Sequence, residues 1–232
     1  MTKAQKIVII LGLFCWVAIG WMIYVNYYAT KPIPKPKPDN FPDTKLPQYR
    51  AVKVFSKLGP VKIYIKRDSV HKISIHKSYH PFSKYEVKND TLNLWLENVP
   101  QDQRKKVQRS IYLFVKELDF IDVEAGETII TGFHGGKISA INRSGYLRFW
   151  HNYFDEIKLS SAGVCNFRLE QDNACKKLEV FLSNRSKLTA NIQILDSFSL
   201  EAGRKSEVNI ANYNKSKLKK FVWDVPLEEA LK

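Results

Sequence analysis

Two stretches in the second half of the chain, IKLSSAGVCNFRL at 157–169 and FSLEAGRKSEVNI at 198–210, share one plan. Each begins with an alternating apolar strand, turns at a small residue followed by glycine, and ends with a second alternating pair. Apolar openings of this kind recur at intervals of 18 to 21 positions, at Phe120, Ile138, Ile157, Leu178, Phe198 and Leu218. A nearly constant interval of this length indicates a repeated β-unit.

A unit of about twenty residues with short strands cannot bury its apolar face alone, whereas stacked units can. The repeat therefore predicts an all-β fold in which equivalent strands pair in parallel, a β-helix or β-solenoid of about five coils. A leucine-rich repeat has a similar period, but its dense leucines and regular asparagine are missing. Residues 50–115 also alternate with period two, and the turn-forming pair Asn89–Asp90 favours an antiparallel pairing there.

An apolar segment precedes this β-region. Ile7 to Val25 are nineteen consecutive uncharged and mostly apolar residues, enough for a helix to cross a hydrocarbon core about 30 Å thick. We expect one transmembrane α-helix that acts as an uncleaved signal anchor, and a cleaved signal peptide is the alternative. Lys3 and Lys6 before it are balanced by Lys31, Lys35, Lys37 and Lys45 after it, so charge alone does not favour export. A short basic N-terminus before a long apolar run is typical of a signal anchor, and we expect a single-pass protein of the bacterial inner membrane with a periplasmic C-terminal domain.

Composition divides the rest of the chain. Six prolines interleaved with lysines follow the apolar segment and predict an extended spacer. The expected organisation is a transmembrane anchor at 1–30, a Pro/Lys-rich linker at 31–49, a strand-rich part of the head domain at 50–115, the coils at 116–222 and a C-terminal cap or tail at 223–232.

The formal net charge of +14 favours contact with an anionic partner such as an acidic glycan, an anionic lipid or an envelope protein. Both candidate contact clusters lie near expected ends of the solenoid, where charge also prevents edge-to-edge pairing, so both interpretations stay open. The absence of an interleaved aromatic platform argues against nucleic acid. The clusters are Arg104, Lys105, Lys106 and Arg109, and Lys215, Lys217, Lys219 and Lys220.

Few residues suggest catalysis. Alternation places Asp122 and Glu124 on one outward face, but the equivalent positions of later repeats build no acidic groove for glycoside hydrolysis. Three histidines, His71, His76 and His80, lack nearby cysteine or carboxylate at metal-ligand spacing. We therefore expect no catalytic residue, no cofactor and no metal site.

Two cysteines of the predicted coils, Cys165 and Cys175, lie ten positions apart. An oxidising compartment would permit a disulfide between them. Two buried, unpaired thiols are the alternative, because free cysteine is among the residues most often buried.

The segments VKVFSKLGPVKIYIK (52–66) and DTLNLWLEN (90–98), with the two repeats quoted above, resemble the GIN-type head domain of the auto-transporter adhesin family, common in Bacteroidetes envelopes. The resemblance covers residues 50–222 and implies an exported, right-handed β-helical domain with no established catalytic residues. Adhesion is the name of that family rather than a demonstrated activity. This chain departs from the pattern in its less glycine-rich corners and in its retained anchor.

These features together predict a non-enzymatic, membrane-anchored envelope domain, displayed outside the cytoplasm, with a binding, adhesion or structural role. One alternative is a membrane-tethered cytoplasmic scaffold that self-associates end to end, as bactofilins do. A glycan-processing β-helix enzyme is the other alternative.

Overall fold

The computed structural model of the chain describes residues 40–56, 61–104, 107 and 109–223, which belong to one compact unit. This part is all-β, with two short 3-10 helices, η2 (His80–Phe82) and η3 (Asn212–Lys217). No helix within it is long and apolar enough to cross a membrane. The anchor predicted at 7–25, the linker up to residue 39 and the tail from residue 224 lie outside the described residues.

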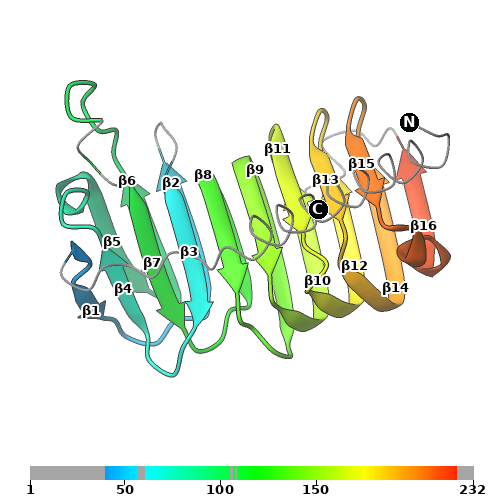
Figure 1. The fold of residues 1–232 in the computed structure, drawn as a ribbon, viewed down its shortest axis with the longest axis horizontal. Helices are drawn as coiled ribbons and strands as arrows, with labels where there is room; N and C mark the ends of the chain where they lie inside the picture. Colours follow the sequence, from blue (N-terminus) through cyan, green and yellow to red (C-terminus); the bar gives the residue numbers. More distant parts are fainter. Residues whose placement is uncertain (1–39, 57–60, 105–106, 108, 224–232) are drawn as a thin grey trace, which may run out of the picture. The chain divides into compact units, whose positions relative to one another are not determined.

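Sixteen strands make up the sheet, and Figure 1 shows them side by side from β1 to β16. The first seven are β1 (Asp43–Lys45), β2 (Ala51–Ser56), β3 (Lys62–Arg67), β4 (Lys72–Ile75), β5 (Ser83–Lys88), β6 (Thr91–Leu96) and β7 (Ser110–Val115). The remainder are β8 (Phe120–Thr131), β9 (Lys137–Trp150), β10 (Tyr153–Ser161), β11 (Cys165–Leu169), β12 (Ala174–Leu182), β13 (Lys187–Ala190), β14 (Gln193–Ala202), β15 (Glu207–Ile210) and β16 (Leu218–Trp223).

The strands form two rows that share β8 and β9. One row runs β5-β6-β2-β8-β9-β10-β12-β14-β16, and the other runs β1-β4-β7-β3-β8-β9-β11-β13-β15. The first half of β8 pairs with β2 and its second half with β3, while β9 pairs first with β10 and then with β11. Because both long strands continue from one row into the other, the rows are halves of one curled sheet (Figure 1).

The predicted parallel β-helix or β-solenoid of about five coils is wrong. The described strands form one mixed sheet, in which the pairs β1-β4, β4-β7 and β5-β6 are antiparallel. A repeat interval determines which strands are neighbours, and Ile138, Ile157, Leu178 and Phe198 are register partners in turn. The interval does not determine how the sheet curves or how its N-terminal strands pair, and these two features define the fold.

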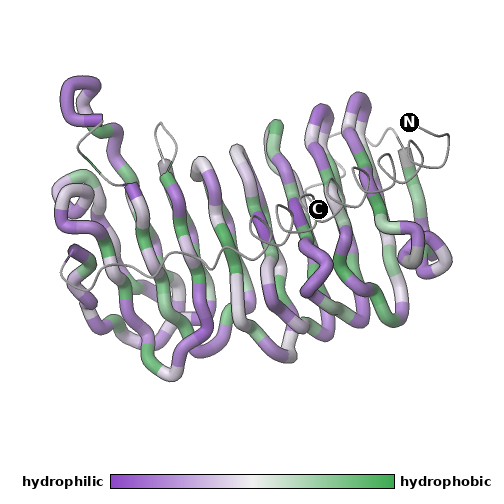
Figure 2. The backbone as a smooth tube through the Cα atoms, in the orientation of Figure 1, coloured by the Kyte–Doolittle hydropathy of each residue, from purple (hydrophilic) through white to green (hydrophobic). Residues whose placement is uncertain are grey.

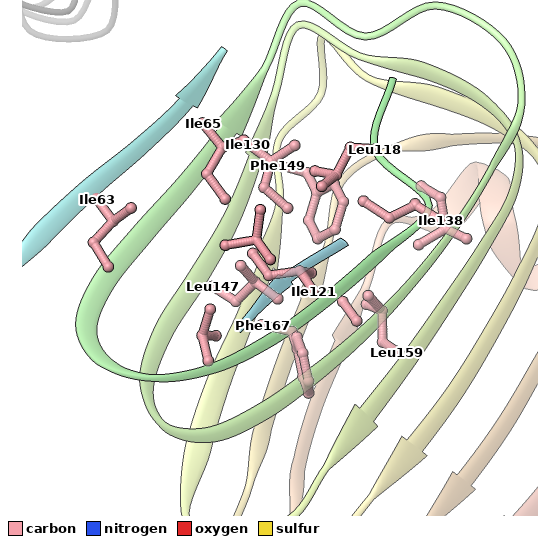
Figure 3. Packing of buried hydrophobic residues seen from close by; sticks show 14 of the residues in the cluster. Ile63, Ile65, Leu118, Ile121, Ile130, Ile138, Leu147, Phe149, Leu159 and Phe167 are labelled. Atoms are coloured by element: carbon pink, nitrogen blue, oxygen red, sulfur yellow. The ribbon is translucent and has the colours of Figure 1, made fainter. Parts of the chain in front are cut away.

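Alternate side chains of both rows point into a single apolar core, and Figure 2 shows the resulting alternation of hydropathy along the strands. Ile121 of the first row lies near Ile130 and Phe149 of the second (Figure 3), and all three are fully buried. Burying one such side chain contributes about 1.5–3 kcal/mol. The core therefore fixes which residues remain on the outer surface of the sheet.

Buried asparagines hold the corner where the chain enters β10 and β12. The Nδ2 of Asn152 donates to the Ile130 carbonyl at 2.9 Å, and its Oδ1 accepts from the Phe133 amide at 3.1 Å. The Nδ2 of Asn173 donates to the Phe149 carbonyl at 2.8 Å, and its Oδ1 accepts from the Asn152 amide at 3.0 Å. Buried backbone groups need such partners, so this ladder fixes the turn that carries Phe133.

Candidate anion-binding pocket

A pocket of about 320 Å³ opens beside the turn between β8 and β9. Its lining comes from segments far apart in the sequence: Arg50 before β2, Arg67 at the end of β3, residues 116–119 between β7 and β8, residues 133–137, and Phe154 of β10. Its volume is at the lower end of the range found for small-molecule sites. The curl of the sheet brings these segments together.

The glycine-rich turn 132–136, with the sequence GFHGG, forms one wall of the pocket. Gly135 and Gly136 both have φ of +79°, the left-handed region that favours glycine. The Gly135 amide donates to the Tyr153 carbonyl at 2.8 Å, and the Gly136 amide donates to the Asp155 carboxylate at 3.0 Å. A Cβ added at either glycine would meet nothing within 4 Å. A ligand can therefore approach this fixed stretch of backbone closely.

The floor of the pocket consists of apolar side chains that are almost fully buried. Leu118 and Phe133 are each 3% exposed and Phe154 is 1% exposed. The rings of Phe133 and Phe154 stack with their centroids 6.1 Å apart. These side chains belong to the core behind the turn 132–136, and they offer little apolar surface to a ligand.

The rim is cationic. The lining contains Arg50, Arg67, Lys116 and Lys137 against two carboxylates, those of Glu117 and Asp119. This composition leaves an excess of two positive charges, with His134 counted as neutral. A pocket with such an excess attracts anions.

The rim cations differ in what they already bind. Arg50 reaches Asp119 at 2.9 Å and Glu117 at 3.3 Å. Lys137 lies 2.8 Å from Glu156, and this hydrogen bond raises the pKa of its ammonium group.

Arg67 and Lys116 are exposed and form no ion pair with the residues that the structure describes. The Cβ of Arg67 would lie 3.9 Å from a Cβ added at Gly132, so this arginine stands next to the glycine-rich turn. Arg67 and Lys116 are therefore the two rim cations available to an anionic ligand.

Of the basic cluster predicted at 104–109, the described members Arg104 and Arg109 precede β7 and are not among the residues that line the pocket. The Arg104 guanidinium donates to the Val99 carbonyl at 3.2 Å and to the Asn98 side chain at 3.4 Å. Arg109 is half-buried, while Lys105 and Lys106 fall outside the described residues. Its role as an anion contact stays a prediction.

The second predicted cluster lies at the β16 end of the first row. Lys215 and Lys217 belong to η3, and Lys219 and Lys220 to β16, where Lys220 pairs with Glu201. Because β7 and β16 are separated in the sheet by six intervening strands along the pairing order, the structure does not bring the two clusters together. The role of this cluster also stays a prediction.

The carboxylates considered for catalysis have different surroundings. Both oxygens of Asp122 accept hydrogen bonds from Arg143, at 2.7 and 2.8 Å, whereas Glu124 is exposed. A two-point arginine–carboxylate pair is a strong structural contact. In the part of the chain that the structure describes, no group of histidine, cysteine and carboxylate residues is placed to hold a metal ion.

Cys165 on β11 and Cys175 on β12 are both buried free thiols in this structure. Burial raises the pKa of Cys165 to about 11 and that of Cys175 to about 12. Both groups are therefore neutral and poorly nucleophilic near pH 7.

Inspection of the sequence missed the pocket, because its charged residues are single positions in separate segments rather than a cluster. Arg67 and Lys116 are 49 positions apart. The available local signal was the turn GFHGG, whose three glycines in five residues indicate unusual backbone geometry.

No protein-family profile and no curated protein matches the chain. Similar solved structures include a "putative adhesin" from Bacteroides fragilis, at 13% identity and a TM-score of 0.45, with 80% of this chain and 96% of that chain covered. A "putative adhesin" from Parabacteroides distasonis shows 13% identity and a TM-score of 0.38, with coverages of 80% and 96%. A "putative lipid binding protein" from the same species shows 13% identity and a TM-score of 0.35, with coverages of 80% and 94%.

These similar structures come from Bacteroidetes, and two of them are described as a "putative adhesin", which is consistent with the sequence resemblance. No family profile supports the narrower GIN-type assignment. The likeness is too weak to transfer a function to this chain.

Proposed function

We propose that the chain is a non-enzymatic binding module that recognises an anionic ligand through the pocket beside the turn 132–136. The observation that carries the proposal is the pair of exposed cations, Arg67 and Lys116, that have no acidic partner within the described residues. The neighbouring Arg50 is held by two carboxylates, which fixes this side of the pocket in advance. Arg67 and Lys116 supply the charge that attracts an anion to this side of the pocket.

The module would act outside the cytoplasm, tethered to the inner membrane. This part of the proposal rests on the sequence, namely the apolar run from Ile7 to Val25 and the proline-rich spacer after it. An extended spacer keeps a binding domain clear of the bilayer and leaves its surface open to envelope components.

Binding to immobilised heparin tests whether the pocket rather than the overall charge attracts anions. A protein with a net charge of +14 will bind any polyanion to some degree, so the variants must be matched in charge. We compare Arg67→Gln/Lys116→Gln with Arg185→Gln/Lys205→Gln, whose two residues are exposed and lie in turns away from the pocket. Both double variants lose two positive charges.

The full chain, held in a non-ionic detergent, is eluted with a salt gradient. We expect the pocket variant to elute at clearly lower salt than the turn variant, because only the pocket variant loses convergent contacts to the ligand. Equal elution of the two variants would show that dispersed surface charge accounts for the binding, and it would refute the proposed site.

A further inference from the structure

The pocket rim carries carboxylates beside its free cations, and this mixture limits the class of ligand. The side chains of Glu117 and Asp119 remain 50% and 49% exposed although both bind Arg50. A carboxylate has about four acceptor positions, so each retains capacity to accept hydrogen bonds from a ligand. These groups repel a ligand that is anionic on every side, and they favour one that also presents hydroxyl donors.

The floor of the pocket argues against an acyl chain. Leu118, Phe133 and Phe154 are at most 3% exposed, so insertion of an apolar tail would bury almost no apolar protein surface. Hydrophobic affinity scales with the area removed from water, at about 25 cal/mol per Å². The ligand that fits is therefore small and polar.

The open glycine wall fits a ring. Because a Cβ at Gly135 or Gly136 would meet nothing within 4 Å apart from the adjacent residues, a flat or puckered ring can approach this backbone between His134 and Lys137. Combined with the mixed rim, this wall favours a hydroxylated ring that carries one negative group.

We infer that the pocket binds a uronic-acid-type unit of an acidic glycan, with the ring carboxylate at Arg67 and Lys116 and ring hydroxyls donating to Glu117 and Asp119. This inference rests on the proposed function and narrows its ligand. A bidentate arginine–carboxylate contact supplies the charge selection, and the two protein carboxylates select for hydroxyls. The glycan remains intact, because the proposal includes no bond cleavage.

Isothermal titration with tetragalacturonate tests the inference. The control ligand is the same tetrasaccharide with its carboxylates methyl-esterified, which keeps the ring and hydroxyls but removes the charge. We expect the free acid to bind the full chain, in a non-ionic detergent without a sugar head group, at least tenfold more tightly than the ester. Arg67→Gln/Lys116→Gln should weaken binding at least tenfold, and Arg185→Gln/Lys205→Gln less than twofold.

Two other anions separate failure of the inference from failure of the proposed function. If inorganic phosphate or anionic lipid vesicles bind in a manner that depends on Arg67 and Lys116, and tetragalacturonate does not, the pocket binds anions but the glycan assignment is overturned. If no anion shows dependence on these two residues, both proposals fail. Should the double variant misfold by circular dichroism, the single variants Arg67→Gln and Lys116→Gln are measured instead, and each must bind the free acid more weakly than the unmodified chain.

Discussion

Burial determines the chemistry of the two thiols in the sheet. Cys165 is 1% exposed and Cys175 is 0% exposed. Removal from water disfavours the thiolate, which raises the pKa of Cys165 to about 11 and that of Cys175 to about 12. The pKa of an unfolded cysteine is about 8.5, so folding lowers the fraction of reactive thiolate across the neutral pH range.

Alkylation with iodoacetamide at pH 8 should therefore leave Cys165 and Cys175 unmodified in the folded protein. In concentrated guanidinium both should react, at least about 100-fold faster, since the rate follows the thiolate fraction. Peptide mapping by mass spectrometry distinguishes these sites from Cys15. Rapid labelling of the folded protein, or a disulfide-linked peptide under non-reducing conditions, would contradict the assignment of two buried free thiols.

Between the strands, the asparagine ladder replaces the backbone pairing that the corners lack. The side chain of Asn173, which is 2% exposed, accepts from the Asn152 amide and donates to the Phe149 carbonyl, which also accepts from the Glu170 amide at 3.2 Å. Deleting the carboxamide leaves the buried Asn152 amide without its acceptor, and one such unpaired group costs about 1–3 kcal/mol. The ladder also reaches the pocket, because Asn152 binds the Phe133 amide.

Asn173→Ala should lower the free energy of unfolding by about 1–3 kcal/mol, as measured by urea denaturation of the full chain. The matched control is Asn209→Ala on β15, whose side chain is exposed and whose loss should change stability by less than about 0.5 kcal/mol. A similar small effect for both variants would show that the ladder does not stabilise the corner.

Across the molecule, the local patterns of the sequence predict the strands and their inward side chains, but they do not predict the curvature of the sheet. Alternation identified the inward side chains, and the repeat interval brought Ile157 and Leu178 into register. The turn at Asn89–Asp90 was also correctly predicted, since both residues have positive φ and connect the antiparallel pair β5-β6. The inward faces, the register and this turn depend on residues that are close together in the sequence or that recur at a fixed interval, so they can be predicted from one sequence.

The curl of the sheet and the pocket depend on contacts that a single sequence does not display. Strand β9 continues through Gly145, where the repeat predicted a corner: this glycine has φ of +78° and pairs with Cys165 of β11, while the register between β8 and β9 shifts beside it. Arg67 and Lys116 meet only after β3, β7 and β8 have assembled. The basic clusters were easier to see because their members are close together in sequence, yet none of their described members lines the pocket.

The orientation of the chain across a membrane is a further property of the whole molecule. If Ile7 to Val25 anchors an exported domain, protease added to intact spheroplasts should digest a tag placed at the C-terminus. Protection of the tag until the cells are lysed would contradict export and favour the cytoplasmic scaffold. A cytoplasmic enzyme, which must stay protected in intact spheroplasts, serves as the control.

The most direct test of the central claim is a backbone-amide NMR titration of the full chain with a heparin-derived tetrasaccharide. We expect the largest shifts on residues 133–137 and 116–119 and on Arg67, with small shifts elsewhere in the sheet. Shifts concentrated at residues 104–109 or 215–220 would contradict this expectation, because they would place anion recognition on the basic clusters instead of the pocket.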